Sequence, residues 1–174
     1  MAKTSGGVRT WNMAVSQGSA TRASVKRQTA EEKIMAVFAD FDKQGYSRQQ
    51  PFAVGKVEKR MSDFAKANNI TLGSDQLYMS SRSLGHGRRD SKVAKGIAAS
   101  REELANFPKK RRSMRLYYDK IEKRFVYATN TTKYIVDPNY ELKISRKQTK
   151  KVAFITATKI AGTEFNMSKY IRVK

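Results

Sequence analysis

Large apolar residues recur at helical spacing in the first half of the chain. Thr29 and Glu32 have the spacing of a capping box, and apolar residues at three- and four-residue intervals predict a helix that ends at Gly45. A second apolar stripe predicts a helix over residues 56–68. Residues 29–75 are therefore expected to be helical.

Two shorter helices are expected next. Val93 and Ile97 have the spacing of a helix that begins after residue 90. Ser100 and Glu103 form a second capping box, which predicts a short helix that Pro108 closes.

From residue 114 onward the apolar pattern changes from a period of 3.6 to a period of 2, which is typical of strands. An earlier short strand is expected at residues 76–79, ending in a polar turn over 80–83. The later strands are expected at residues 115–119, 124–128, 133–136, 140–144, 152–158 and 170–173. Helices followed by closely spaced strands predict an α+β fold, in which helices pack on one face of an antiparallel meander.

Three segments follow from these patterns. Residues 1–28 contain five basic residues and no acidic residue, are rich in Gly, Ser and Thr, and are expected to form a flexible basic arm. Residues 29–75 are expected to form a helical N-terminal segment, and residues 76–174 an α+β domain.

The charge of the chain is strongly unbalanced. The 174 residues include 36 Lys and Arg against 15 Asp and Glu, a formal net charge of +21. Self-repulsion on this scale favours a polyanionic partner, with nucleic acid first and an acidic membrane or an acidic protein second. No apolar run reaches the roughly 18 residues of a membrane span, and the N-terminus has no apolar secretory stretch. We therefore expect no membrane partner, and a location in the cytoplasm or inside a virion.

The residue types also limit the chemistry. The chain has no Cys, which excludes disulfides and thiolate sites, and its single histidine, His86, excludes a multi-histidine metal site. No calcium-loop motif and no phosphate-binding glycine loop occurs. We expect neither a metal nor a cofactor.

Basic residues gather beside aromatic ones after His86, a combination typical of phosphate contact and base stacking on looped or single-stranded RNA. The residues expected to bind nucleic acid are Arg88, Lys109, Lys110, Arg111, Arg112 and Tyr117.

The segment LYMSSRSLGHGRRD, residues 77–90, has an apolar strand, a Ser-rich turn and then a histidine. It resembles the opening of the phage-associated nuclease-like domains of the barnase–EndoU–colicin–RelE superfamily. Phe107-Pro108 and the run VAFITAT, residues 152–158, resemble later parts of that pattern, so the resemblance covers about residues 76–174. It implies metal-independent RNA cleavage, in which the 2′-hydroxyl attacks the adjacent phosphate.

By this resemblance His86 is the general base or acid, and Arg89, with Arg88 behind it, holds the phosphate. Thr156 would bond the phosphate, and Ser81 would orient His86 or the scissile group. Tyr118 would stack on a base or donate a proton. With one histidine, the second proton-transfer group must be a Lys, a Tyr or a carboxylate.

Two other hypotheses stay open at this stage. The chain could be a non-catalytic nucleic-acid-binding protein that is packaged with a genome. It could also be a structural component of a virion, whose basic surface meets an acidic protein. An acidic inhibitor protein is a further partner that a ribonuclease toxin would have.

Overall fold

The structure is a computed structural model that describes residues 27–160 and 168–174. Nearly all of the predicted arm, residues 1–28, lies outside the described residues. The elements in chain order are α2 (Ala30–Gln44), β1 (Phe52–Lys56), α3 (Lys59–Ala67), β2 (Gln76–Met79), α4 (Ser81–Gly87), α5 (Asp90–Ala94), α6 (Arg101–Lys110), the 3₁₀ turn η1 (Arg111–Ser113), β3 (Arg115–Asp119), β4 (Arg124–Ala128), β5 (Thr132–Ile144), β6 (Lys147–Lys159) and β7 (Tyr170–Val173).

The strands form one seven-stranded sheet in the order β1-β2-β6-β5-β4-β3-β7. The predicted α+β class is confirmed. The prediction of a purely antiparallel meander is wrong, because the sheet is mixed. β2 pairs in parallel with β6, with Leu77 opposite Val152, whereas the other neighbours are antiparallel. This pairing brings the segment after β2 against β6, although the paired residues Leu77 and Val152 are 75 residues apart in the chain.

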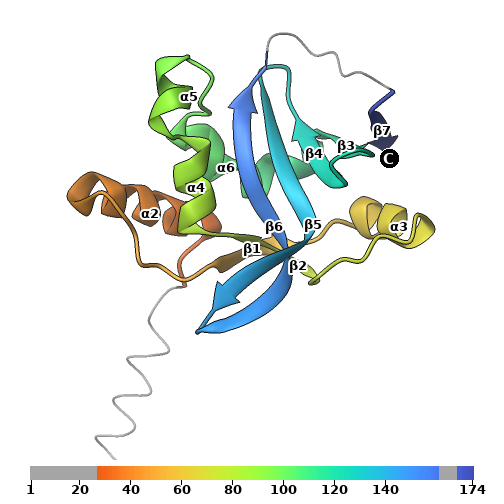
Figure 1. The fold of residues 1–174 in the computed structure, drawn as a ribbon, viewed down its shortest axis with the longest axis horizontal. Helices are drawn as coiled ribbons and strands as arrows, with labels where there is room; N and C mark the ends of the chain where they lie inside the picture. Colours follow the sequence, from red (N-terminus) through yellow and green to blue (C-terminus); the bar gives the residue numbers. More distant parts are fainter. Residues whose placement is uncertain (1–26, 161–167) are drawn as a thin grey trace, which may run out of the picture.

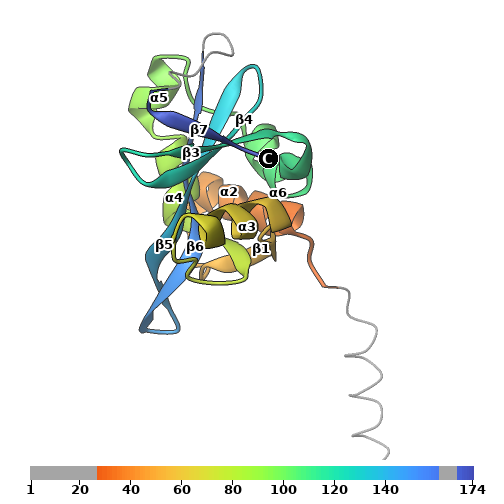
Figure 2. The same cartoon turned by 90° about the vertical axis from the view of Figure 1, so that its right-hand side faces the viewer.

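Helices α2, α3, α4 and α6 contribute residues to one large core cluster. Figures 1 and 2 show how these helices lie beside the sheet. Phe38 of α2, Leu84 of α4 and Phe107 of α6 are almost completely buried in it. Along β3, Leu116 belongs to this cluster while its neighbour Tyr117 belongs to a smaller cluster on the other side, as the two-residue period of a strand requires.

The capping boxes are confirmed. The Thr29 hydroxyl accepts the Glu32 amide at the start of α2, and the Ser100 hydroxyl accepts the Glu103 amide at the start of α6. α2 ends before Gly45, which has a φ of 84°. These motifs were predictable because each one lies within four residues of sequence.

Several predicted boundaries are corrected. The segment 29–75 is not only helical: Phe52–Lys56 forms β1, which pairs with β2 and so joins the same sheet. Pro108 does not close α6, which continues to Lys110. Residues 133–136 and 140–144 are parts of one long strand, β5.

The helix after residue 90 is shorter than expected and faces the other way. α5 ends at Ala94, so Ile97 lies outside it, and Val93 is 49% exposed while Lys92 is 8% exposed. The buried position of α5 is thus held by a lysine, which leads to the site described below.

Candidate active site

His86 is on helix α4, between Gly85 and Gly87. Ser80 caps α4 by accepting the Ser83 amide at 3.1 Å, so the predicted polar turn over 80–83 is the first turn of this helix. Leu84 is fully buried and anchors α4 on the core. Arg82 and His86 are four residues apart and share the exposed face of the helix.

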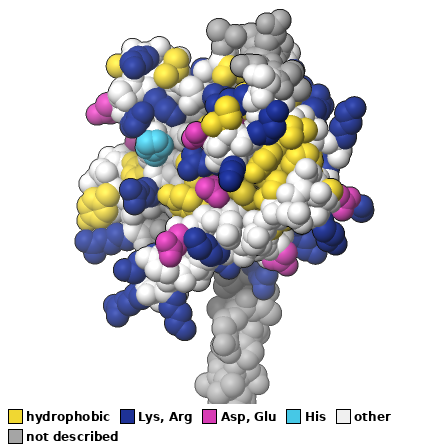
Figure 3. Space-filling model, turned by 45° about the vertical axis from the view of Figure 1, so that its right-hand side comes forward, with side chains coloured by type: hydrophobic (Ala, Val, Ile, Leu, Met, Phe, Trp, Pro, Cys, Tyr) yellow, Lys and Arg dark blue, Asp and Glu magenta, His cyan; other side chains and the backbone are white. Residues whose placement is uncertain are grey.

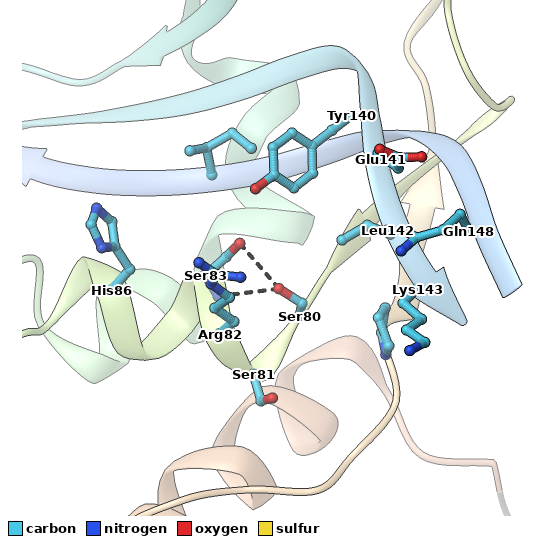
Figure 4. A pocket seen from close by; sticks show the side chains of 12 residues that line it. Ser80, Ser81, Arg82, Ser83, His86, Tyr140, Glu141, Leu142, Lys143 and Gln148 are labelled. Carbon is cyan, nitrogen blue, oxygen red and sulfur yellow. Dashed lines mark hydrogen bonds between the residues drawn. The ribbon is translucent and has the colours of Figure 1, made fainter. Parts of the chain in front are cut away.

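A pocket of about 570 Å³ lies between α4 and the hairpin of β5 and β6. Arg82 and His86 line it from α4, and Tyr140 and Lys143 line it from β5. The rings of His86 and Tyr140 reach into this space from opposite sides (Figure 4). The pocket therefore offers an imidazole, a phenol and several cations to one ligand.

Lys92 is close enough to His86 for its charge to act on the histidine, and it is held by oxygen atoms of β6. Its ammonium group donates to the Thr156 hydroxyl at 2.8 Å, to the Thr158 hydroxyl at 2.9 Å and to the Ala157 carbonyl at 3.1 Å. On this side of β6, the pairing with β2 ends at Ala153, and an isolated bridge to residue 98 begins only at Thr158. Lys92 thus fills a gap along the edge of β6.

The positive charges of this region are not neutralised by ion pairs. Among the described residues, no acidic side chain forms a salt bridge with Arg82, Arg89 or Lys92. Burial is the main cause that lowers the pKa of Lys92, and the charges of Arg89 and Lys133 add to it.

The same surroundings act on the histidine. Desolvation lowers the pKa of His86 below 6.5, and the charges of Arg89, Lys92 and Arg82 lower it further. The ring is exposed at the surface among Lys and Arg side chains (Figure 3). A lowered pKa keeps the imidazole neutral at pH 7, and a neutral imidazole nitrogen can accept a proton.

Four predicted residues meet here, and two of them have altered roles. Arg89 is exposed next to His86, while the Arg88 guanidinium is occupied by the Ala99 carbonyl. The Thr156 hydroxyl accepts a hydrogen bond from Lys92, which the sequence analysis did not include. No local pattern marks Lys92, since its partners are 64 to 66 residues away.

Ser81 and Tyr118 do not support the predicted roles. The Ser81 hydroxyl donates to the Ser47 carbonyl at 3.4 Å and points away from His86 (Figure 4). Tyr118 packs against Phe64 and Phe125, and burial and nearby acidic groups raise its pKa. β3 is separated from β6 by β4 and β5, so Tyr118 is roughly three strand spacings, about 14 Å, away along the sheet.

The predicted nucleic-acid-binding run is divided by the fold. Arg111 is 3% exposed, and its guanidinium binds the Glu58 carboxylate at 3.1 Å, so this side chain is a structural group and is not available to a phosphate. Lys109, Lys110 and Arg112 are exposed, and Lys109 pairs with Glu31 at 3.2 Å.

Tyr117, the last of the predicted nucleic-acid contacts, is not open for base stacking. Only 7% of it is exposed, and its ring packs against Tyr170 with the Arg172 guanidinium above it. It lies in the small cluster on the face of the sheet opposite the main core.

Residues 27–160 and 168–174 contain no group of three acidic, histidine or cysteine side chains arranged to hold a metal ion. None of their helices is long and apolar enough to cross a membrane. Comparison with protein-family models, with curated proteins and with solved structures gave no match for this chain.

Proposed function

We propose that this protein is a metal-independent ribonuclease that binds RNA in the pocket between α4 and the β5–β6 hairpin. The observation that carries the proposal is the combination of His86, whose pKa is lowered, with the buried ammonium of Lys92, in a region where no described ion pair neutralises the cations. The resemblance to the nuclease-like domains of the barnase–EndoU–colicin–RelE superfamily is part of this proposal.

In the proposed reaction, His86 accepts the proton of the ribose 2′-hydroxyl. The 2′-oxygen then forms a bond to the adjacent phosphorus, and the bond from phosphorus to the 5′-oxygen breaks. The products are a 2′,3′-cyclic phosphate and a free 5′-hydroxyl. A positioned general base of this kind contributes about 10²- to 10⁴-fold to the rate.

The cations around His86 would stabilise the charge that develops on the phosphate. Arg82 and Arg89 are exposed and free to contact phosphate oxygens, whereas all three protons of the Lys92 ammonium are used by β6. Lys92 would therefore act as a fixed charge, with Thr156 as a positioning residue, and would not supply a proton.

The departing 5′-oxygen needs a proton. Tyr140 lines the same pocket as His86, and its hydroxyl end is directed toward α4 (Figure 4). It replaces Tyr118 as the proposed proton donor, because Tyr118 packs against Phe64 and Phe125 and lies on β3, which β4 and β5 separate from β6.

The test is cleavage of an end-labelled single-stranded RNA by the full chain in the presence of EDTA at pH 7. Wild-type protein should yield cyclic-phosphate ends, and His86→Ala should cut about 10²- to 10⁴-fold more slowly with unchanged thermal unfolding. Lys43→Ala is the matched control, because it removes one exposed basic side chain at the end of α2. Intact RNA after incubation with micromolar wild-type protein would refute the proposal.

One observation favours a second candidate, a protein that binds RNA without cutting it. The exposed His86 ring has no hydrogen-bond partner among the described residues, whereas a catalytic base is usually oriented by a third group. This candidate predicts salt-sensitive RNA binding that His86→Ala leaves unchanged, with no cleavage by either protein.

A further inference from the structure

The tips of β5 and β6 form a two-stranded ribbon that leaves the sheet. Residues 140–144 pair with residues 147–151, while β4 reaches only to Val136 on β5 and β2 begins only at Val152 on β6. Among the described strands, the ribbon thus has no neighbour on either edge. It extends away from the body of the molecule (Figures 1 and 2).

This ribbon is strongly basic. Residues 140–151 contain five Lys and Arg against one acidic residue, Glu141. Four of the basic side chains are exposed and form no ion pair with any described residue; they are Lys143, Arg146, Lys147 and Lys150. The fifth, Lys151, lies over the Tyr78 ring at 4.8 Å.

The direction of the ribbon is fixed by contacts at both ends. At its tip, the Ser145 amide donates to the Gln50 side chain at 2.9 Å. At its base, the Gly73 amide donates to the Pro138 carbonyl at 2.8 Å, and a Cβ on Gly73 would come within 2.6 Å of the Lys151 amide nitrogen. Such close backbone packing holds the ribbon in place relative to α4.

The ribbon also forms one wall of the pocket. Tyr140, Lys143 and Gln148 line the same cavity as His86, so the pocket continues from the histidine onto the basic ribbon. An RNA strand with one phosphate at His86 would have its neighbouring nucleotides next to these side chains.

We propose that the ribbon of residues 140–151 is an arm that binds the backbone of single-stranded RNA on one side of the scissile phosphate. The inference rests on the proposed function and specifies its substrate class, a single strand several nucleotides long. Tyr140 offers a ring for base stacking beside the cations, the combination that single-strand binders use. The deep, narrow major groove of double-helical RNA does not admit side chains in the same way.

The test measures binding of a fluorescent, unstructured RNA of about 20 nucleotides to the full chain over a salt series. The variant carries Lys143→Gln, Arg146→Gln, Lys147→Gln and Lys150→Gln. The control carries Lys43→Gln, Lys66→Gln, Lys120→Gln and Lys123→Gln, which remove the same charge from exposed positions outside the ribbon and the pocket.

Each phosphate contact on a single strand contributes about −0.7 to the slope of log affinity against log salt concentration. Loss of four contacts should therefore make the slope about 3 units shallower and weaken binding on the order of 100-fold near 0.15 M salt. The control variant should keep a slope close to that of the wild type. Equal changes in the two variants would overturn the inference.

Cleavage separates this inference from the proposed function. If both hold, the ribbon variant still cuts a dinucleotide, and its KM rises by a larger factor for the longer RNA than for the dinucleotide. If wild-type protein binds single strands through the ribbon but cuts nothing, the ribonuclease proposal is refuted and the inference that the ribbon binds RNA is kept. If wild-type protein cuts RNA, and the ribbon variant binds and cuts long RNA as the control variant does, only the inference about the ribbon is refuted.

Discussion

Removal of the Glu58 carboxylate should strongly destabilise the fold. Glu58 and Arg111 are 8% and 3% exposed at their side chains and lie 3.1 Å apart. The same carboxylate accepts the Arg60 guanidinium at 2.8 Å and the Tyr127 hydroxyl at 2.6 Å. Glu58→Ala leaves a buried guanidinium without its counter-charge, which costs about 3–5 kcal/mol in the free energy of unfolding.

This loss is large compared with the total stability of an ordinary domain, about 5–15 kcal/mol. For a chain of this size, each kcal/mol lowers the Tm by roughly 2–4 °C, so a decrease of about 6–20 °C is expected. Urea unfolding followed by circular dichroism at pH 7 measures the free energy, and a thermal scan measures the Tm. Glu122→Ala removes an exposed carboxylate at the β3–β4 turn and is the matched control.

The double variant Glu58→Met, Arg111→Met decides whether the effect comes from the buried charge. It should recover most of the lost stability, because neither charge is then buried alone. A Glu58→Ala protein that unfolds within about 1 kcal/mol of the wild type would refute this reasoning. So would a double variant that is less stable than Glu58→Ala.

Three further predictions concern the candidate site and the ribbon beside it. The His86 ring should titrate below pH 6.5 in an NMR experiment on the folded chain. Between the pKa values of His86 in the folded and the unfolded chain, the unfolded chain binds more protons. The free energy of unfolding should therefore fall as the pH drops below 6.5, and this group should not affect it above pH 6.5. In the proposed reaction the rate should likewise rise with pH through the pKa of His86 and then level off, and a rate independent of pH between 4.5 and 7 would contradict a histidine base. Gly73→Ala should cost about 1–3 kcal/mol in urea unfolding, because the new Cβ meets the Lys151 amide, and an unchanged midpoint would contradict the close packing beneath the ribbon.

Some features of the site were within reach of the sequence. The histidine follows β2 closely in the chain. The resemblance assigns His86 and Thr156 to one site, and the fold brings both residues into one region. The burial of Arg111 also had a signal, since Leu104, Phe107 and Arg111 are spaced three and four residues apart and share one face of α6 and its extension. The sequence analysis assigned Arg111 to nucleic-acid binding because of its basic neighbours and did not use this helical spacing.

The sequence by itself determined the local structure. Both capping boxes, the end of α2 at Gly45, and the strands β3, β4 and β7 depend on residues within a few positions of one another, and periodicity and capping report such interactions. The excess of positive charge, and hence the expectation of a polyanionic partner, also needs no structure.

Only the tertiary structure decided which charges are buried and which are available to a ligand. The parallel pairing of β2 with β6 joins residues 77 and 152, and it places Lys92 under Thr156 and His86 beside the pocket. Arg111 is not available to a ligand, because it is paired with Glu58, 53 residues earlier in the chain. The physical reason is that desolvation and hydrogen bonding depend on neighbours in space, whereas a run of basic residues in the sequence shows only that the charges exist.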